Sequence, residues 1–333
     1  MPTCGSQMPI CDVPIRFDTY KGCSHACSYC FVKRLSDIRD IELGETPKAL
    51  EDFINGKRTK ITSWCDWDIP IHWGGVSDPF QPCERIHKRS LECLKILKRT
   101  GYPYIVSTKS ILPTEKEYLD EISGSNCVFQ ISAVCGKYDK YESGASTFEQ
   151  RLGMMKIMAP IVKRLIVRVQ PFVPEVEKDV IQMLKEYKKA GVYGIVLEGM
   201  KYRTKRKNTT KFEGDNVLNL AMLKSSLGRI KSEAHEQGLV FLCGENRLRS
   251  MGDSLTCCGC EGVEGFKVNT FNINSFNCGR VAISTEAQKK KGTAGGFITM
   301  CQGMEHKYGL ALQKASFVET MERYYRKHKG IIG

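Results

Sequence analysis

The residues best suited to chemistry are three cysteines in one short segment near the start of the chain. Cys23, Cys27 and Cys30 stand at C-x3-C-x2-C spacing. Thiolates are soft ligands that suit iron–sulfur clusters. A cubane cluster contains four irons, so three thiolates leave one iron without a protein ligand, and a small molecule can bind there. The spacing therefore predicts a [4Fe–4S] cluster with one open iron.

Two other uses of these cysteines compete with the cluster. Structural zinc sites are closed by four ligands, usually supplied as two spaced pairs. His25 is a poor fourth ligand because it lies between Cys23 and Cys27, where a short loop leaves it little reach. A disulfide would leave one of the three cysteines over, and residues 1–17 contain neither the apolar core nor the basic leader of a signal peptide. The open cluster is the preferred interpretation.

The motif also carries aromatic residues on both sides of its last cysteine, Tyr29 and Phe31. In this it resembles the radical S-adenosylmethionine superfamily. The resemblance implies that the open iron binds the amino and carboxyl groups of S-adenosylmethionine. It implies that the reduced cluster cleaves this cofactor to methionine and a 5′-deoxyadenosyl radical, which abstracts a hydrogen atom from a substrate. An electron donor such as flavodoxin or ferredoxin is then an expected partner.

The elements that must position this loop alternate along the chain. Short runs rich in Val and Ile predict strands at 13–20, 69–73, 104–107, 127–134, 164–173 and 193–198. Helical patterns occupy 46–53, 85–98, 177–190 and 217–236, and a capping box at 146–149 predicts one more helix. Repeated βα units predict an α/β fold with a parallel sheet, here a partial (β/α)6 barrel, which is also the core fold that the resemblance implies.

The chain divides into two expected regions. Residues 1–215 would form the barrel with its N-terminal cluster loop. Residues 216–333 would form the final barrel helix, a Cys-rich extension and a helical tail at about 309–329, because the βα rhythm stops after residue 239.

Ligands of parallel βα folds bind at the carboxyl ends of the strands, and several polar residues fall there. Together they resemble the spore photoproduct lyase and DNA repair photolyase-like group over residues 14–199, with Ser77-Asp78, Thr108-Lys109 and the segment 148–152 as further matches. That resemblance implies contacts to S-adenosylmethionine from side chains at matching positions, namely Tyr29, Ser77, Lys109, Ser132 and Arg151. Gly75 would let the backbone approach the cofactor closely.

The chain departs from that group in two places. Gly75 stands where the spore enzyme has a hydrogen-donating cysteine, two residues before the serine. The C-terminal part is rich in cysteine and does not match. Four of its cysteines could bind a second iron–sulfur cluster or zinc, namely Cys243, Cys257, Cys260 and Cys278. Alternatively, the thiol of Cys258 could replace the missing hydrogen donor.

Charge bears on the substrate. The chain has a formal net charge of +13, which favours polyanionic partners. A basic segment follows the sixth expected strand and should overhang the reactive end of the barrel; its candidate nucleic-acid contacts are Tyr202, Arg203, Lys205, Arg206 and Lys207. We therefore expect the substrate to be a nucleobase in DNA or RNA, with thymine-derived bases favoured by the resemblance, for lesion repair or base modification.

Two other function classes stay open at this point. A radical enzyme that modifies a peptide or protein is compatible with a Cys-rich extension that holds an auxiliary cluster. A zinc-dependent nucleic-acid binder without enzymatic activity is also compatible with the cysteines and the charge. The sequence contains no run long enough to span a membrane, and its sixteen cysteines suggest reduced thiols in a cytoplasmic setting.

Overall fold

The structure is a computed structural model that describes residues 1–4, 11–32, 37–59, 62, 65, 68–212, 215–269 and 272. Its centre is an eight-stranded sheet with the order β1-β2-β5-β6-β7-β8-β9-β13. Neighbouring strands from β2 to β13 run parallel, whereas β1 pairs antiparallel with β2. The predicted α/β class and the mostly parallel sheet are confirmed. The parallel strands follow one another in sequence order, as they would in a partial barrel, and the partial barrel itself stays a prediction.

The strands are short and mostly buried. Their bounds are β1 Thr3–Cys4, β2 Ile15–Phe17, β5 Ile71–Trp73, β6 Tyr104–Thr108, β7 Cys127–Ser132, β8 Arg164–Phe172, β9 Gly194–Gly199 and β13 Val240–Cys243. Two small sheets lie outside this one: β3 Tyr20–Lys21 pairs with β4 Glu42–Leu43, and β10 Lys201–Tyr202 and β11 Thr209–Phe212 flank β12 Asp215–Leu218.

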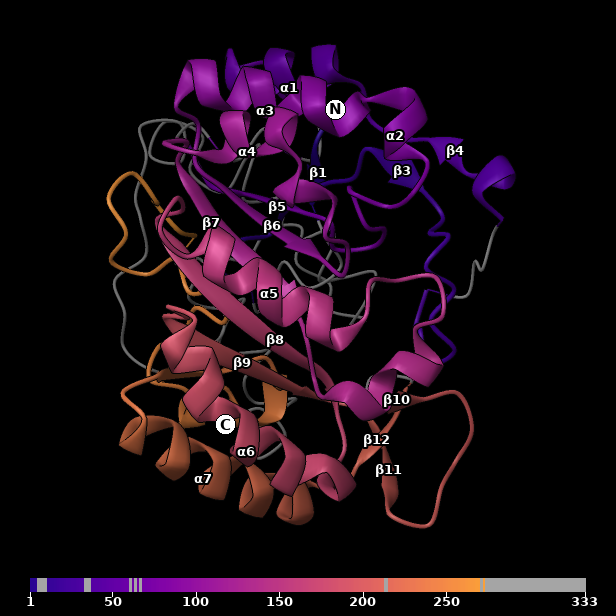
Figure 1. The fold of residues 1–333 in the computed structure, drawn as a ribbon, viewed down its shortest axis with the longest axis vertical. Helices are drawn as coiled ribbons and strands as arrows, with labels where there is room; N and C mark the ends of the chain where they lie inside the picture. Colours follow the sequence, from indigo (N-terminus) through magenta and orange to yellow (C-terminus); the bar gives the residue numbers. More distant parts are fainter. Residues whose placement is uncertain are drawn as a thin grey trace, which may run out of the picture.

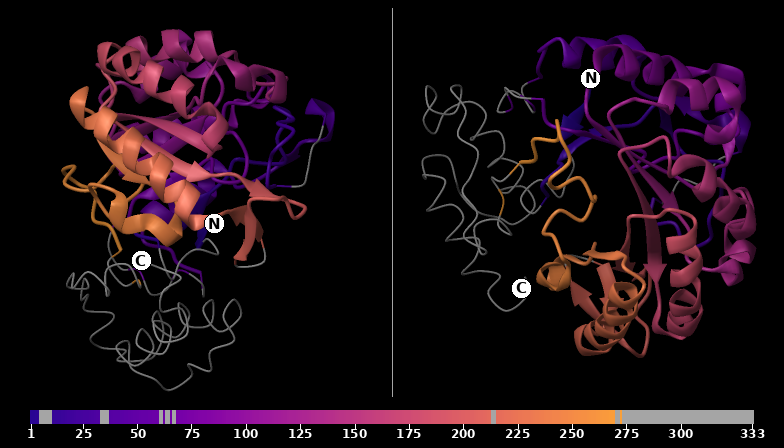
Figure 2. Two further views of the ribbon diagram at one scale, coloured as in Figure 1. Left: turned by 90° about the horizontal axis from the view of Figure 1, so that it is seen from below. Right: turned by 60° about the vertical axis from the view of Figure 1, so that its left-hand side comes forward.

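The helices form an outer layer over one face of the large sheet, as Figures 1 and 2 show. They are α1 Pro47–Ile54, α2 Glu84–His87, α3 Arg89–Thr100, α4 Lys116–Ile122, α5 Phe148–Met158, α6 Glu177–Lys189 and α7 Leu220–Glu236. Among the helices in the described part of the chain, none has the length and hydrophobicity that crossing a bilayer requires.

The alternation of side chains along the strands divides the core into two clusters. On β6, Val106 belongs to the large cluster under the helices, whereas Ile105 faces the other side of the sheet. That second side is covered by the segment 256–268, drawn in orange in Figure 2, which contributes Cys258, Cys260 and Phe266 to the smaller cluster. The sheet is therefore buried on both faces.

Several predicted elements differ from the structure. The helix expected at 85–98 is two helices, because Lys88 has φ +50° and the carboxylate of Glu84 accepts the N–H groups of Ser90 and Leu91. The capping box lies one residue later than predicted, with Thr147 as the N-cap and Gln150 as its partner.

Two further corrections concern where the first expected strand ends and where the alternation of strands and helices ends. The strand expected at 13–20 breaks after β2, because the carbonyls of Asp18 and Thr19 accept N–H groups from Glu45 and Gly44 rather than from the large sheet. The rhythm does not stop at residue 239, because β13 adds a parallel strand beside β9. The predicted division at residue 215 falls in β12, and the expected helical tail lies outside the described residues.

Candidate functional site

The cysteine loop leaves β3 and lies at the carboxyl edge of the sheet. Gly22 has φ +83° and Ala26 has φ +50°, so the chain turns sharply on both sides of His25. The N–H of Cys30 donates to the carbonyl of Cys27 at 3.0 Å, and the N–H of Ser28 donates to the carbonyl of Tyr141 at 2.9 Å. These turns hold the three predicted cluster ligands in one compact loop.

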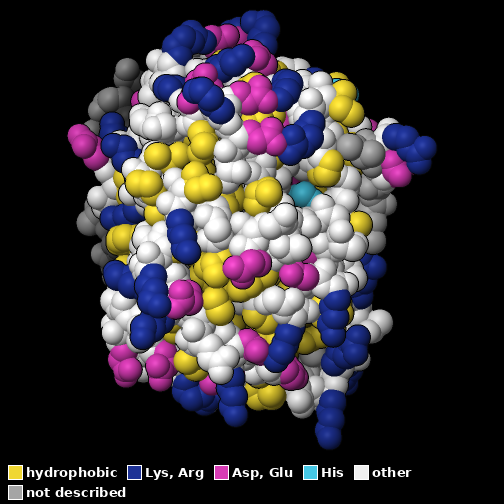
Figure 3. Space-filling view, in the orientation of Figure 1, with side chains coloured by type: hydrophobic (Ala, Val, Ile, Leu, Met, Phe, Trp, Pro, Cys, Tyr) yellow, Lys and Arg dark blue, Asp and Glu magenta, His cyan; other side chains and the backbone are white. Residues whose placement is uncertain are grey.

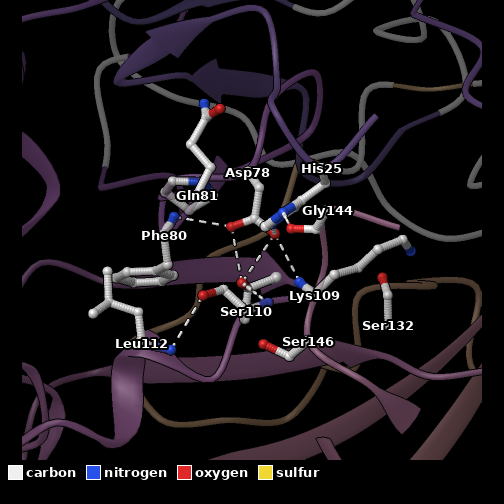
Figure 4. Close-up of polar contacts among 12 residues, drawn as sticks. His25, Asp78, Phe80, Gln81, Lys109, Ser110, Leu112, Ser132, Gly144 and Ser146 are labelled. Atoms are coloured by element: carbon white, nitrogen blue, oxygen red, sulfur yellow. Dashed lines mark hydrogen bonds and ion pairs between the residues drawn. The ribbon is translucent and has the colours of Figure 1, made fainter. Parts of the chain in front are cut away.

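His25 fixes this loop to two other segments (Figure 4). Its Nδ1 lies 2.8 Å from the carbonyl oxygen of Gly144, and its Nε2 lies 3.1 Å from Oδ2 of Asp78. Burial raises the pKa of Asp78, but the charge and hydrogen bond of His25 and the N–H of Lys109 outweigh burial, so the pKa lies below its usual value. His25 therefore acts as a structural link, and its nitrogens do not face a shared metal ion.

Further polar side chains after β5 bind the same stretch of backbone. Gln81 is fully buried; its Oε1 accepts the N–H of Ser24 at 2.8 Å and its Nε2 donates to the carbonyl of Gly22 at 3.1 Å. The hydroxyl of Ser77 donates to the carbonyl of Tyr20 at 2.7 Å. The backbone that leads into the cysteine loop is thus held in place by the segment that follows β5.

A buried carboxylate, Glu142, joins three of the residues predicted to contact S-adenosylmethionine. The hydroxyl of Tyr29 donates to Oε1, Lys109 lies 3.5 Å from Oε1, and Arg151 donates to Oε2 at 2.5 Å. Burial raises the pKa of Glu142, but Lys109 and Arg151 outweigh it and bring the pKa below its usual value. The ammonium of Lys109 also lies 5.9 Å from the centre of the Tyr29 ring.

Arg151 is 1% exposed, and its donors are used within the protein. It donates to the carbonyl of Ser132 at 2.6 Å in addition to Glu142. This burial favours a role in holding the carboxyl end of β7 and the Glu142 side chain, rather than direct contact with a cofactor. Arg151 and Ser132 are thereby connected to Tyr29 and Lys109.

The remaining predicted cofactor residues follow β5. Ser77 is buried and accompanies Asp18, whose pKa is raised to about 6, chiefly by burial. A Cβ atom at Gly75 would lie 3.7 Å from the side chain of Arg16, an ordinary contact distance. Space alone therefore does not require glycine at this position.

The fit of the three thiols to a cluster rests on their chemistry and placement. No group of three or more His, Cys, Asp or Glu side chains within the described ranges is close enough to hold a single metal ion. Burial raises the pKa of Cys23 to about 12 and that of Cys27 to about 11, so metal binding must displace their protons. Three unpaired thiols at the carboxyl edge fit a cluster with an open position.

The C-terminal cysteines are in a different environment. Cys258 and Cys260 pack in the smaller hydrophobic cluster, and Cys243 is buried at the end of β13. The described members of the predicted second site, Cys243, Cys257 and Cys260, do not form a group of single-ion ligands, and Cys278 lies outside the described residues. A second zinc or cluster site thus gains no support.

Cys258 lies next to the strand that leads to Gly75. Its Sγ is 3.9 Å from Nδ1 of His72, a residue of β5, and its backbone carbonyl accepts from Nε2 of Gln130 at 3.0 Å. The hydrogen bond with Cys257, and burial, raise the pKa of Cys258 well above its usual value. Cys258 is therefore a protonated thiol on the face of the sheet opposite the helices.

The predicted nucleic-acid residues lie on and beside the small sheet β10–β12. Arg203, Lys205, Arg206 and Lys207 are exposed, and Figure 3 shows basic side chains gathered over this corner, at the lower right. The guanidinium of Arg203 donates to the carbonyl of Cys30 at 3.3 Å. The basic segment is thus in direct contact with the cysteine loop, although Tyr202 is half-buried and one face of its ring lies 5.7 Å from the guanidinium of Arg206.

Sequence reasoning missed the roles of four buried polar residues, namely Asp78, Gln81, Glu84 and Glu142. The first three recur every third position after a strand, in the sequence Ser-Asp-Pro-Phe-Gln-Pro-Cys-Glu, and this spacing could have indicated a loop that binds another segment. Nothing in the surrounding sequence distinguishes Glu142 from an ordinary exposed acid.

Comparison with solved structures defines the class of fold. Two structures superpose with TM-scores of 0.52 at 14% and 15% sequence identity, and each match covers 66% of this chain and 74% of the other. Both are spore photoproduct lyase: one is a mutant with bound S-adenosylmethionine and dinucleoside spore photoproduct, and the other is a complex with dinucleoside spore photoproduct. The predicted resemblance to this radical S-adenosylmethionine enzyme is therefore confirmed in the fold.

Sequence comparison adds little beyond this. The chain is 24% identical over 207 residues to uncharacterized proteins of Mycobacterium bovis and Mycobacterium tuberculosis. These matches cover 57% of this chain, which spans about 60% of the length of those curated proteins. No family model matches the chain.

Proposed function

We propose that the chain is a radical S-adenosylmethionine enzyme that abstracts a hydrogen atom from a nucleobase, for lesion repair or base modification. The observation that carries this proposal is the loop of Cys23, Cys27 and Cys30 at the carboxyl edge of a parallel sheet whose fold matches spore photoproduct lyase. When bound, the cluster and cofactor supply a 5′-deoxyadenosyl radical. The other contributions come from the protein's own side chains.

Those side chains divide into ligands and positioning groups. The three thiolates hold the cluster. Tyr29, Lys109 and Ser132 surround the site where S-adenosylmethionine would lie, with Gly75 and Ser77 at its edge. Glu142 and Arg151 hold the first group in place through buried ionic contacts. Their fixed geometry would orient the cofactor before substrate binds, which lowers the entropic cost of reaction.

The substrate assignment depends on charge and placement. Exposed basic side chains on and beside β10–β12 contact the cysteine loop through Arg203, so a phosphate backbone bound there would bring a base near the radical. A base must leave the stack to react, at a cost of a few kcal/mol that such contacts offset. The spore photoproduct bound in the structural relatives supports a thymine-derived base as the first substrate to test.

Cys258 is the proposed hydrogen donor to the substrate radical. Its S–H bond would break as a new C–H bond forms on the base. This would leave a thiyl radical, which one electron from the reducing system and one proton would return to the thiol. The contact between Cys258 and His72 of β5 supports this role, because β5 leads to Gly75, where the thiol of the spore enzyme is missing.

One experiment tests the radical chemistry. The protein is reconstituted anaerobically with iron and sulfide, reduced with dithionite or a flavodoxin system, and incubated with S-adenosylmethionine and oligonucleotides that contain deuterated thymidine. We expect about four irons per chain and deuterium in the 5′-deoxyadenosine. Deoxyadenosine without label would contradict the thymine substrate, and the absence of both iron and deoxyadenosine would contradict the enzyme class.

A second experiment tests nucleic-acid binding. Replacement of Lys205, Arg206 and Lys207 by alanine should weaken oligonucleotide binding and reduce its salt dependence. With fewer phosphate contacts, binding releases fewer counterions from the nucleic acid. The matched control replaces three exposed lysines of the opposite end, Lys95, Lys98 and Lys116. Equal losses in both variants would show that only net charge matters.

A further inference from the structure

The segment that follows β5 is bound to the cysteine loop more extensively than folding of a short turn requires. Asp78, Gln81 and Glu84, here called the brace residues, are all buried. Gln81 holds the backbone of Gly22 and Ser24, and Glu84 accepts from the hydroxyl of Tyr20. Asp78 alone reaches the centre of the loop, at His25.

The Asp78 carboxylate is itself rigidly placed. Oδ1 accepts from the N–H of Phe80 at 2.9 Å and from the hydroxyl of Thr108 at 2.8 Å. Oδ2 accepts from the N–H of Lys109 at 2.7 Å and faces Nε2 of His25 at 3.1 Å. The donors therefore come from the end of β6 as well as from the turn after β5. Asp78 thus fixes the cysteine loop relative to the carboxyl ends of both β5 and β6.

His25 is held equally firmly on its other side. The N–H of Gly144 donates to the carbonyl of His25 at 3.0 Å, in addition to the Nδ1 contact with the Gly144 carbonyl. A Cβ atom at position 144 would lie 2.4 Å from the carbonyl oxygen of Ser24, so only glycine permits this approach. The imidazole is clamped between Asp78 and Gly144, and Figure 4 shows it between them.

The clamp has a direct geometric consequence. Oδ2 of Asp78 binds His25 in the cysteine loop and the N–H of Lys109, a residue whose side chain surrounds the proposed cofactor site. One carboxylate oxygen therefore fixes the loop relative to that part of the site. We propose that Asp78 is a positioning residue that acts through His25 to set the orientation of the cysteine loop toward Lys109. This inference rests on the proposed function, since the orientation of the loop relative to Lys109 affects activity only if a cluster-bound cofactor lies between them.

The test uses the isosteric variant Asp78→Asn. An amide presents NH2 where one carboxylate oxygen stands, and both oxygens face donors, so at least one side of the network is lost. His25→Asn is the second variant, because its shorter side chain cannot span from Gly144 to Asp78. The matched control is Asp253→Asn, which breaks the other described His–Asp pair, with His235 at 2.8 Å.

The first measurement is made on the metal-free protein, so that it is independent of the proposed chemistry. Hydrogen exchange followed by mass spectrometry should show faster exchange over residues 22–30 in Asp78→Asn and His25→Asn. The double variant should exchange no faster than either single variant, because both remove the same contact. Wild-type protection of the loop in Asp78→Asn, or additive effects in the double variant, would overturn the inference.

The second measurement is made on reconstituted protein. In Asp78→Asn and His25→Asn, iron content should stay close to wild type. The KM for S-adenosylmethionine should rise about tenfold, equivalent to about 1.4 kcal/mol. The change that added S-adenosylmethionine causes in the EPR signal of the reduced cluster should become smaller. Asp253→Asn should leave both unchanged. An unchanged KM in Asp78→Asn, with normal turnover by the wild-type protein, would overturn the inference and leave the proposed function standing. A wild-type protein that cleaves no cofactor would refute the proposed function. In that case hydrogen exchange would still test the contact between Asp78 and the loop.

Discussion

Two regions of the molecule are rich in cysteine, and they differ in almost every physical respect. The loop from Cys23 to Cys30 lies at the carboxyl edge of the sheet and is surrounded by buried polar side chains, among them His25 and Asp78. The segment from Cys257 to Cys260 packs against the middle of the sheet, where Ile166 and Leu242 contact it in the same hydrophobic cluster. The first has the setting of a ligand site, and the second has largely the setting of a core.

This difference shows why the density of cysteines is a poor guide to metal binding. A thiol in a core behaves as a small hydrophobic side chain, and burial raises the pKa of Cys260 well above its usual value. In the loop, buried thiols still have the cation of Lys109 nearby, and this charge opposes the rise in the pKa of Cys27. The separation is not complete, because Cys257 in the second region has Arg249 and Arg168 nearby, and its hydrogen bond with Cys258 and these cations lower its pKa to about 5. The neighbours of each cysteine, rather than the density of cysteines, determine its setting.

The largest expected effect is in the loop. Cys27→Ala should abolish cluster assembly and the production of 5′-deoxyadenosine, because two thiolates cannot hold the cluster firmly, while the circular dichroism spectrum stays close to wild type. Iron analysis and anaerobic turnover measure this. Continued formation of deoxyadenosine by the variant would remove the loop from the chemistry.

The next effect concerns the buried ion pair that supports the loop. Arg151→Met should lower the free energy of unfolding by about 3 kcal/mol, because the buried, charged Glu142 loses its closer cationic partner and keeps only Lys109 and the hydroxyl of Tyr29. Urea denaturation of the metal-free protein measures this. Arg229→Met, which breaks the exposed pair with Glu177, is the control and should cost about 1 kcal/mol or less. Similar losses would show that the loop region is not specially stabilised.

A smaller effect depends on pH and should be confined to the loop side. Because burial raises the pKa of Asp18 to about 6 from the usual 3.8, the unfolded chain releases this proton first as pH rises. The stability that the protonated group provides is complete below about pH 4 and is lost by about pH 6, to an extent on the order of 3 kcal/mol. The free energy of unfolding of Asp18→Asn should therefore rise by this amount relative to that of wild type as pH increases from 4 to 7.

The control for this prediction has a shift of the opposite sign. Burial raises the pKa of Asp253, but Lys231, His235 and the N–H of Phe241 outweigh burial and lower it. The contribution of Asp253 is therefore lost only as pH falls below the usual range of aspartate, and the difference between Asp253→Asn and wild type should be flat between about pH 4 and 5, below the range in which its partner His235 changes charge. Thermal unfolding at stepped pH measures both variants; parallel curves for Asp18→Asn and wild type would refute the assignment.

The smallest effect is expected in the other cysteine-rich region. Cys260→Ala should leave iron content and deoxyadenosine formation unchanged and lower the free energy of unfolding by about 1 kcal/mol, the loss of one small buried group. Chemical denaturation and iron analysis are again sufficient. Loss of iron in this variant would break the comparison between the two regions and restore a second metal site.

Much of the fold could be predicted because its signals are local. Short runs of Val and Ile located β5 to β9, and helical periodicity located α1, α6 and α7 to within a few residues. The β13 strand was missed because the Cys- and Gly-rich sequence after it hides the last βα unit. The division of α2 from α3 was missed because the cause, Glu84, is a tertiary contact that caps the start of α3 from within α2.

The sequence by itself determined the chemistry that this protein can offer: three thiols in one loop, a parallel α/β frame and polar residues at its strand ends. Ligand spacing and strand alternation are properties of neighbouring residues, so they can be read along the chain. Tertiary structure alone decided which polar groups meet. Glu142 joins Tyr29, which is 113 residues away, to Lys109 and Arg151. Asp78 meets His25 across more than fifty residues of sequence, because buried charges must find partners wherever the fold brings them.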